Sequence, residues 1–185
     1  MKAAIIGGGV IGGGWASRFL LNGWDVNIYD PDNDSERKLN LMLDNARRSL
    51  PSLYDFNLPK EGEIKFCNSI KEAVENVNWI QESVPERLNM KQDVFKEIQK
   101  YCDTSTVIAS STSGFKPSEL NEGATNPSQI IVCHPFNPVY LLPLVEVVPS
   151  EISDPKFVKL SSDYLNKIGM KPLIVRKEID AHIAD

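Results

Sequence analysis

Positive charge is scarce in this sequence. It has 20 Lys and Arg residues against 25 Asp and Glu, a net charge of −5 at pH 7 and a pI near 5.1. Nucleic-acid binding needs a basic surface that neutralises phosphates, so we expect no nucleic-acid partner. No apolar run reaches the roughly 20 residues of a membrane-spanning helix, so we expect no membrane association. The first predicted strand begins at residue 2. We therefore expect no signal peptide and a cytoplasmic location.

Cysteine is also rare, and its placement matches neither a disulfide framework nor a metal site. The sequence has three cysteines, Cys67, Cys102 and Cys133. Their number is odd, they are widely spaced, and no two of them form a Cys-x-x-Cys motif. This usage is typical of a reducing, cytosolic compartment. We expect three buried structural thiols and no bound metal. Internal repeats and low-complexity tracts are absent from the sequence as well, and its length suits one sizeable domain.

Glycine is concentrated near the N-terminus, in a Gly7-x-Gly9-x-x-Gly12 pattern. The pattern follows an apolar run at 3–6 and opens a segment with helical character. A dinucleotide needs this succession of strand, tight turn and helix N-terminus. Gly7 permits the turn, Gly9 lets the backbone approach a pyrophosphate, and Gly12 lets the helix pack closely on the strand. Any tight strand–helix turn also favours glycine, so the pattern alone leaves both readings open.

The residues after the glycine turn favour NAD. The first helical turn, with Val10 and Ile11, directs free N–H groups and the positive helix end toward phosphates. Asp30 follows a predicted strand at 25–29 and comes 18 residues after Gly12. A carboxylate there accepts hydrogen bonds from the adenosine ribose and repels a 2′-phosphate. Asp30 is otherwise a common turn residue before proline. The combined spacing predicts NAD rather than NADP as the cofactor.

Strand and helix patterns alternate along the whole chain. This alternation predicts an α/β fold: a Rossmann-type, doubly wound, mostly parallel sheet with helices on both faces. The expected strands span residues 2–6, 25–29, 63–67, 78–83, 106–110, 129–133, 144–148 and 171–176. The expected helices span residues 10–21, 34–50, 69–77, 89–101 and 154–168, and a further helix opens within 178–185. We expect residues 1–185 to form one NAD-binding domain.

The catalytic candidates are His134 and Glu146. His134 follows the predicted strand at 129–133 and therefore lies at the carboxyl end of the sheet, where such folds bind ligands. Glu146 interrupts an apolar strand at 144–148, where a lone buried carboxylate is costly to desolvate. A nearby imidazole would partner it, and such a pair suits alcohol oxidation, because the imidazole accepts the hydroxyl proton. A Glu on the polar face of an edge strand is the alternative, and the sequence leaves both open.

Several motifs, in order and with matching spacing, resemble the 3-hydroxyacyl-CoA dehydrogenase superfamily over essentially the whole chain. They are the glycine pattern, Glu-x-x-x-Glu at 82–86, Ser-Thr-Ser at 111–113, His-Pro-Phe-Asn-Pro at 134–138 and Leu-Val-Glu-Val at 144–147. The resemblance implies that His134 is the general base and Glu146 its partner. It also implies that Ser113 hydrogen-bonds the substrate oxygen and that Asn137 shapes the site. The nicotinamide half of the cofactor would contact Glu86 and Lys91.

Three of these residues could instead have no role in the site. Ser113 could be a turn hydroxyl in a Ser/Thr-rich loop, and Glu86 and Lys91 could belong to a solvated helix start. Within the superfamily the chain most resembles the carnitine dehydrogenases. The phrases that carry this likeness lie at 11–16, 19–25, 81–87, 110–118 and 134–147. That branch implies oxidation of the 3-hydroxyl of L-carnitine to 3-dehydrocarnitine, with NAD as oxidant.

Departures from the acyl-CoA enzymes point the same way. The segment after the second strand is shorter and carries mainly Arg47 and Arg48, and Pro143 stands where those enzymes often have lysine. Fewer cations suit a small zwitterion better than a nucleotide-tailed thioester. Asp185 replaces a substrate-site Asn and could balance a quaternary ammonium. His182 is interpreted as a structural or surface side chain.

The resemblance also implies a C-terminal helical domain that closes over the substrate and makes a homodimer. We expect 178–185 to begin the connection to that domain, which this sequence lacks, and the chain alone to bind NAD with little or no turnover. Two alternatives remain open. The chain could serve a 3-hydroxyacyl-CoA or other 3-hydroxyacid dehydrogenase of the superfamily, or a non-catalytic, crystallin-like NAD-binding protein.

Overall fold

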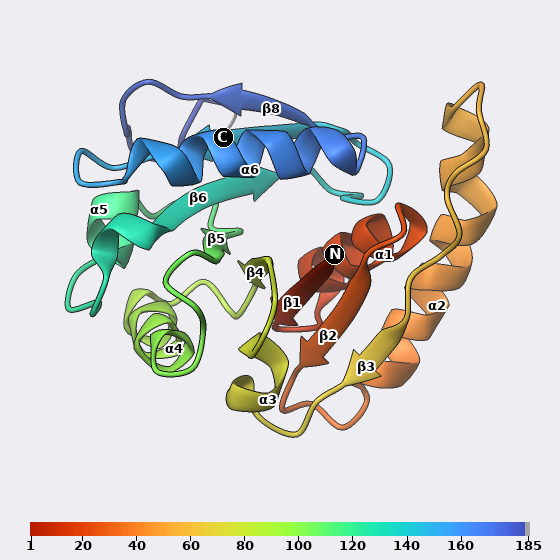
Figure 1. Ribbon diagram of the computed structural model, residues 1–185, viewed down its shortest axis with the longest axis horizontal. Helices are drawn as coiled ribbons and strands as arrows, with labels where there is room; N and C mark the ends of the chain where they lie inside the picture. Colours follow the sequence, from red (N-terminus) through yellow and green to blue (C-terminus); the bar gives the residue numbers. More distant parts are fainter. Residues whose placement is uncertain (184–185) are drawn as a thin grey trace.

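The computed structural model describes residues 1–183, which form one eight-stranded sheet covered by helices (Figure 1). The strands are β1 (Lys2–Ile6), β2 (Asp25–Tyr29), β3 (Ile64–Phe66), β4 (Trp79–Glu82), β5 (Val107–Ser110), β6 (Ile130–Pro135), β7 (Leu144–Val148) and β8 (Lys171–Ile174). The α-helices are α1 (Val10–Leu21), α2 (Ser35–Ser49), α3 (Ile70–Val74), α4 (Leu88–Gln99), α5 (Pro117–Leu120) and α6 (Pro155–Lys167). Two short 3₁₀ helices are η1 (Leu50–Leu53) and η2 (Pro127–Gln129).

The strand order is β3-β2-β1-β4-β5-β6-β7-β8. Every neighbouring pair is parallel except β6 and β7, which are antiparallel. The predicted doubly wound, mostly parallel α/β sheet is therefore confirmed. The order reverses beside β1, with β2 on one side and β4 on the other. A crevice opens at such a switch point, outside the carboxyl ends of the strands, and this is where open α/β sheets bind ligands.

The sheet buries an apolar core on each face. One core packs α1, α2 and α6 against the sheet, and the other packs α3, α4 and α5. The first core is rich in aromatic side chains, with the Phe19 ring 5.1 Å from Trp24 and 5.9 Å from Trp79 between centroids. Burying one large apolar side chain such as Phe19 contributes about 1.5–3 kcal/mol. Burial of apolar side chains thus stabilises both faces of the sheet. The strand ends lie outside these cores and can carry polar groups.

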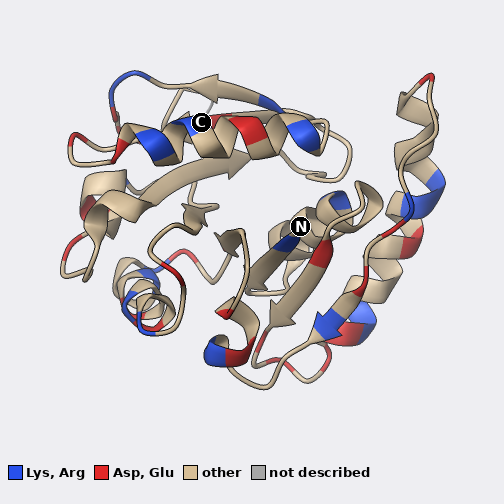
Figure 2. Ribbon diagram, in the orientation of Figure 1, with Lys and Arg blue, Asp and Glu red and all other residues tan. Residues whose placement is uncertain are grey.

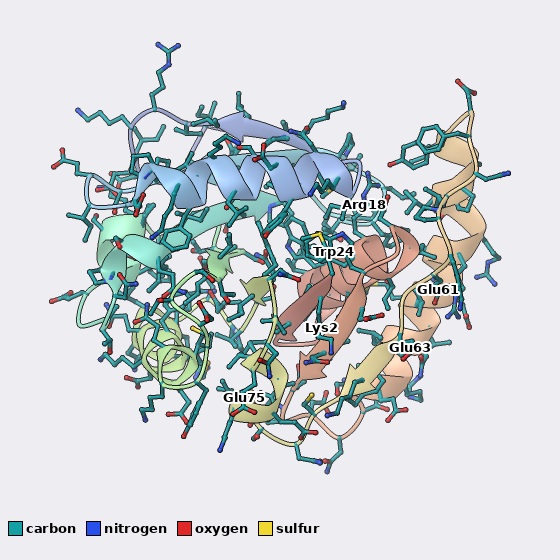
Figure 3. All side chains as sticks on the ribbon, viewed as in Figure 1. Lys2, Arg18, Trp24, Glu61, Glu63 and Glu75 are labelled. Carbon is teal, nitrogen blue, oxygen red and sulfur yellow. The ribbon has the colours of Figure 1, made fainter. Side chains whose placement is uncertain are left out.

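Arg18, a residue of α1 that is labelled in Figure 3, connects this helix to three other segments of the chain. Its buried guanidinium donates to the carbonyl oxygens of Ile168 at 2.8 Å, Gly169 at 2.5 Å and Tyr140 at 3.1 Å. It also donates to the Tyr54 hydroxyl at 2.6 Å. These bonds satisfy the end of α6 and anchor the turn that follows β6.

The structure departs from the sequence prediction at α3, α5 and β6, besides shifts of one or two residues at other element ends. The helix capped by Ser69 ends at Val74 rather than residue 77, because Asn76 adopts the left-handed conformation with φ of 58°. The short α5 was not predicted. The strand expected to end at residue 133 continues through Pro135, so His134 lies inside β6 rather than after it. Antiparallel pairing with β7 extends the strand, and a prediction from local sequence does not include that pairing.

The expected helix within 178–185 does not form in the described part of that segment. Residues 180–183 form turns instead. Ala181 and His182 have φ angles of 55° and 57°, and two successive left-handed residues are incompatible with a right-handed helix. Residues 184–185 lie outside the described part, and so does the role suggested for Asp185.

Lys and Arg alternate with Asp and Glu along the outer sides of α2 and α6 (Figure 2). Within residues 1–183, no helix is both long and apolar enough to cross a membrane. Cys67 and Cys133 are buried as expected, but the expectation is wrong for Cys102, which is only partly buried. Burial still raises the pKa of the Cys102 thiol to about 11. Residues 1–183 contain no group of three or more His, Cys, Asp or Glu side chains that could hold a metal.

Candidate active site

The glycine turn between β1 and α1 lies at the switch point. Gly7 has φ of +96°, and a Cβ there would lie 2.6 Å from the carbonyl oxygen of Ser83. A Cβ on Gly12 would lie 1.8 Å from the carbonyl oxygen of Gly7. Both positions therefore require glycine. A Cβ on Gly9 would meet no atom within 4 Å, so the backbone there borders open space that a ligand can approach.

A first hollow of about 560 Å³ lies beside this turn. Its wall includes Gly7, Gly9, Asp30, Ser83 and Val84. The Asp30 carboxylate accepts hydrogen bonds from the backbone N–H of Gly8 at 2.5 Å and of Asp32 at 2.7 Å. Helix α1 begins at the exposed Val10 with no acidic residue in its first turn, so its positive end is not neutralised locally.

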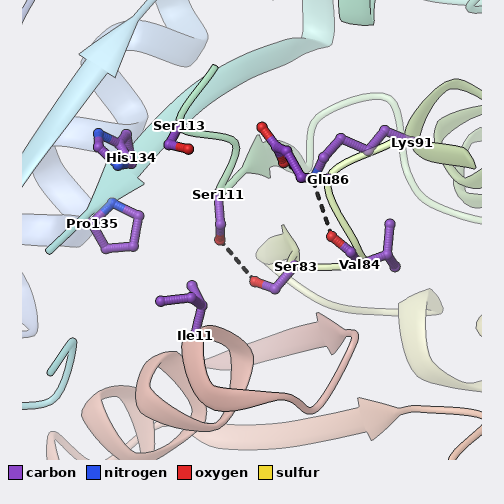
Figure 4. A pocket seen from close by; sticks show the side chains of 9 residues that line it. All are labelled: Ile11, Ser83, Val84, Glu86, Lys91, Ser111, Ser113, His134 and Pro135. Carbon is purple, nitrogen blue, oxygen red and sulfur yellow. Dashed lines mark hydrogen bonds and ion pairs between the residues drawn. The ribbon is translucent and has the colours of Figure 1, made fainter. Parts of the chain in front are cut away.

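A second hollow of about 300 Å³ adjoins the first, because Ser83 and Val84 line both (Figure 4). Its wall brings together residues from four segments that are far apart in sequence. The lining residues are Ile11, Ser83, Val84, Glu86, Lys91, Ser111, Ser113, His134 and Pro135. In Figure 4, Ser113 lies beside His134, while Ser83 and Ser111 lie nearer to Ile11. We call these two adjoining hollows, which extend from Asp30 to His134, the groove.

His134 and Glu146 pair at the far end of this groove. They are direct partners across the antiparallel β6–β7 ladder, and Nδ1 of His134 lies 2.9 Å from Oε2 of Glu146. His134 is 7% exposed and Glu146 is fully buried. Strand β8 covers the outer side of β7, so the alternative of an unpaired Glu on an edge strand is wrong. The other carboxylate oxygen accepts a hydrogen bond from the backbone N–H of Ile183 at 3.0 Å.

Two rings flank the His134 imidazole. Centroid distances are 5.3 Å to Phe136 and 5.4 Å to His182. His182 is buried, with Nε2 lying 3.1 Å from the carbonyl oxygen of Thr112, so it is a structural rather than a surface side chain. The segment ending at Ile183 therefore packs against the imidazole and also completes the hydrogen bonding of Glu146.

Lys91 is buried rather than part of a solvated helix start. Its ammonium lies 2.8 Å from Oε1 of Glu82, 3.2 Å from Oε2 of Glu86 and 3.2 Å from the carbonyl oxygen of Val84. Three acceptors match the three hydrogens of an ammonium group. Glu82 also accepts from the Ser110 hydroxyl at 2.5 Å. Complete burial raises the pKa of the Glu82 carboxyl, against the opposing charge of Lys91.

Glu86 connects this buried ion pair to the loop that carries Ser113. Its carboxylate accepts hydrogen bonds from the Thr112 hydroxyl and, at 3.2 Å, from the backbone N–H of Gly114. Partial burial by itself raises the pKa of Glu86, but the Thr112 bond, the Lys91 charge and the Gly114 bond outweigh it, and the net pKa is lowered. Glu86 thus remains ionised at neutral pH and fixes the loop on either side of Ser113.

The structure gathers most of the predicted site residues along the two hollows. Val10, Gly12 and Glu146 do not line them, but Glu146 pairs with His134, and Val10 and Gly12 flank Ile11 at the start of α1. Asn137 is exposed and does not belong to the wall of either hollow. Sequence reasoning missed the backbone of Ile183 and the side chains of Gln81 and Ser83. Gln81 did carry a signal, since it is a polar residue within the apolar strand at 78–83.

Comparisons with known proteins identify the family of this chain. The family described as 3-hydroxyacyl-CoA dehydrogenase, NAD binding domain, matches residues 2–179. A protein of Ruegeria pomeroyi named L-carnitine dehydrogenase/betainyl-CoA thioesterase is 60% identical over 183 residues, 99% of this chain and 38% of that protein. A Mesorhizobium japonicum protein named L-carnitine dehydrogenase is 46% identical over 185 residues, 100% of this chain and 51% of that protein.

Among solved structures, an FHMPC 5-dehydrogenase described as an NAD⁺-dependent dismutase superposes with a TM-score of 0.90 at 29% identity. The superposition covers 98% of this chain and 59% of that one. The chain thus spans about 38% and 51% of the two curated relatives. The family match over residues 2–179 covers every element that lines the groove. This chain belongs to the 3-hydroxyacyl-CoA dehydrogenase family, in which it corresponds to the NAD-binding domain, and its cofactor is NAD.

Proposed function

We propose that the protein carrying this chain oxidises the 3-hydroxyl group of L-carnitine to the ketone of 3-dehydrocarnitine, using NAD in the cytoplasm. The observation that carries the proposal is the 2.9 Å contact between His134 and the buried Glu146 at the end of the groove. The names of relatives at 60% and 46% identity support carnitine as the substrate.

His134 is the proposed general base. When its Nδ1 carries the proton, that N–H donates to Glu146, and Nε2 keeps a lone pair that accepts the substrate hydroxyl proton. The carboxylate then stabilises the imidazolium that forms. The acceptor for the hydride that leaves C3 of the substrate would be supplied by bound NAD. Ser113, beside His134 on the groove wall, would donate a hydrogen bond to the substrate oxygen and keep its own proton.

The groove supports a matching set of cofactor contacts. Asp30 would hold the adenosine ribose, and the open backbone at Gly9 with the start of α1 at Val10 and Ile11 would hold the pyrophosphate. Gly7 and Gly12 keep that turn tight. At the other end, Glu86 lines the second hollow and would contact the nicotinamide half. Lys91 directs its three hydrogens to protein oxygens, so its proposed contribution in this conformation is to hold Glu86 in place.

We also propose that residues 1–185 form one cofactor domain, that 178–185 lead to a helical domain, and that the complete protein is a homodimer. The large remainder of both relatives supports further structure beyond the matched region. Leu144 on β7 and Leu173 on β8 are 39% and 42% exposed. Apolar side chains exposed on neighbouring strands are typical of a surface that another domain covers.

Oxidation of a 3-hydroxyacyl-CoA is the second candidate, and the family match favours it. The charge pattern on α2 argues for the smaller substrate. Arg47 lies 2.6 Å from Glu61 and 2.9 Å from Asp44, so its charge is already balanced within the chain. A nucleotide-tailed thioester would need cations left free for its phosphates.

A turnover assay distinguishes the candidates. It uses this chain and a chimera in which the chain replaces the matched residues of the Ruegeria pomeroyi relative, which supplies the remaining length. NADH formation is followed with L-carnitine, D-carnitine and 3-hydroxybutyryl-CoA. We expect kcat/KM for L-carnitine to exceed the others by at least about tenfold. Preference for the thioester would overturn the carnitine proposal. NAD binding without any turnover in the chimera would favour a non-catalytic protein.

A further inference from the structure

Three residues next to the histidine–glutamate pair have an unusual backbone. They are residues 181–183, which we call the strap. Ala181 and His182 both adopt the left-handed conformation, with φ of 55° and 57°. Residues that carry a Cβ occupy this region at a cost in free energy, which surrounding contacts must offset. Two contacts with the site contribute, one through the backbone of Ile183 and one through the side chain of His182.

The backbone of the strap orients Glu146. The N–H of Ile183 donates to Oε1 of this carboxylate at 3.0 Å, while Oε2 lies 2.9 Å from Nδ1 of His134. Glu146 is fully buried, and both of its oxygens are bonded, so the plane of the carboxylate is fixed. The strap thus restrains the group that orients the imidazole.

The side chain of His182 reaches the loop that follows β5. His182 is 4% exposed, and its Nε2 lies 3.1 Å from the carbonyl oxygen of Thr112. A carbonyl oxygen can only accept, so Nε2 carries a proton and donates it. Because a peptide unit is planar, the direction of the Thr112 carbonyl also sets the direction in which the chain enters Ser113. His182 therefore restrains Ser113, which lies beside His134 on the wall of the second hollow (Figure 4).

Glu86 holds the same loop through other atoms. Its carboxylate accepts from the Thr112 hydroxyl and, at 3.2 Å, from the backbone N–H of Gly114. Neither bond involves the peptide unit between Thr112 and Ser113, so neither sets the rotation of that unit. Thr112 is fully buried, and its carbonyl oxygen therefore needs a partner within the protein. The hydrogen bond from His182 supplies that partner.

The His182 ring also packs against the His134 imidazole, with 5.4 Å between the two centroids. A phenyl ring would fill the same place but could not donate to Thr112. One side chain thus contacts both the proposed base and the loop that carries the serine. We propose that His182 is a positioning residue that sets the Ser113 hydroxyl relative to His134, so that both reach one substrate oxygen. This inference rests on the proposed oxidation, in which both residues act on the 3-hydroxyl group.

The sequence has two histidines, so nitrogen NMR of isotope-labelled histidine tests the hydrogen bond without any substrate. Above neutral pH, the ring of His182 should carry its proton on Nε2 and the ring of His134 on Nδ1. His182→Phe should shift the carbonyl carbon resonance of Thr112, because that carbonyl loses its donor. His182→Gln should restore the resonance, because the Gln amide donates from the same place. A His182 ring with its proton on Nδ1 instead, or an unchanged Thr112 resonance in His182→Phe, would overturn the inference.

Turnover of L-carnitine by the chimera tests the positioning role itself. His182→Phe should lower kcat by about tenfold to hundredfold, the effect of a misplaced catalytic group. An NAD Kd within about twofold of wild type shows that the variant keeps its fold. His182→Gln should recover kcat to within about threefold of wild type, because it keeps the donor. Lys177→Gln, an exposed position on the same segment, is the matched control and should leave kcat unchanged.

A double variant shows whether His182 acts through the serine. In Ser113→Ala, the further change His182→Phe should lower kcat by no more than about threefold, because the hydroxyl that His182 positions is gone. A His182→Phe enzyme with kcat within about threefold of wild type, an equal loss in His182→Gln, or fully additive losses with Ser113→Ala would overturn the inference while leaving the proposed function intact. A wild-type chimera that does not oxidise L-carnitine would overturn the proposed function and this inference together.

Discussion

Replacement of Glu146 by Gln is the most informative single change in the groove. The carboxylate accepts from two donors, the His134 imidazole at 2.9 Å and the Ile183 backbone N–H at 3.0 Å. An amide of the same shape has only one acceptor oxygen. If that oxygen keeps the Ile183 bond, the amide NH₂ faces Nδ1 of His134. The imidazole must then place its proton on Nε2, where it cannot accept the proton of a substrate.

The expected loss follows from this change of tautomer. A positioned general base contributes about 10²–10⁴-fold to the rate, so Glu146→Gln should lower kcat by that factor. The change corresponds to about 2.7–5.5 kcal/mol of transition-state stabilisation. NAD affinity should be nearly unchanged, because Asp30 and the glycine turn lie at the other end of the groove.

Initial rates of NADH formation in the chimera, with calorimetric NAD titration of the chain, provide the assay. Glu151→Gln is the control, since it removes an exposed carboxylate just after β7. A Glu146→Gln enzyme with kcat within about threefold of wild type would refute the reasoning. So would a loss of rate explained entirely by weaker NAD binding.

Three further predictions follow from other contacts. Calorimetry should show that NAD binds at least about tenfold tighter than NADP. Asp30→Asn should reduce this difference in affinity, because it removes the charge that repels a 2′-phosphate. Equal affinities of the wild-type chain for NAD and NADP would contradict the role of Asp30. The lowered pKa of Glu86 means that its contribution to stability is present above the ordinary value of 4.5 and is lost as pH falls below it. The difference in Tm between wild type and Glu86→Gln should therefore become smaller below about pH 4.5. A Tm difference that does not change with pH would contradict this contribution of the Glu86 carboxylate. Arg18→Met should reduce the free energy of unfolding, measured in urea, by about 2–4 kcal/mol, because three carbonyl oxygens lose their donor. A loss under about 1 kcal/mol would show that the hydrogen bonds of Arg18 are dispensable for stability.

The fold class could be predicted from local sequence, because most strands and helices have a clear pattern of their own. Apolar runs with strand character alternate with amphipathic helices, and the glycine turn marks the first crossover. The helix over residues 35–49 has its buried Leu39, Leu43 and Ala46 at helical spacing. Each element is thus specified by its own residues, and the parallel sheet follows from their alternation.

Features that depend on distant partners were harder to predict. The length of β6 depends on pairing with β7, and the turns at residues 180–183 depend on contacts with Glu146 and Thr112. Lys91 is followed by the polar residues Gln92 and Asp93, so its burial becomes clear only once Glu82 is placed beside it. The pairing of His134 with Glu146 was one of two open readings, because a strand pattern does not identify the neighbour across the ladder.

The central claim is that C3 of L-carnitine transfers its hydrogen to NAD beside His134. The most direct measurement is mass spectrometry of the NADH formed by the chimera from L-carnitine that carries deuterium at C3. The account predicts deuterium in the NADH, and loss of this product in His134→Asn while NAD affinity is retained. NADH without deuterium, or undiminished transfer in His134→Asn, would contradict it.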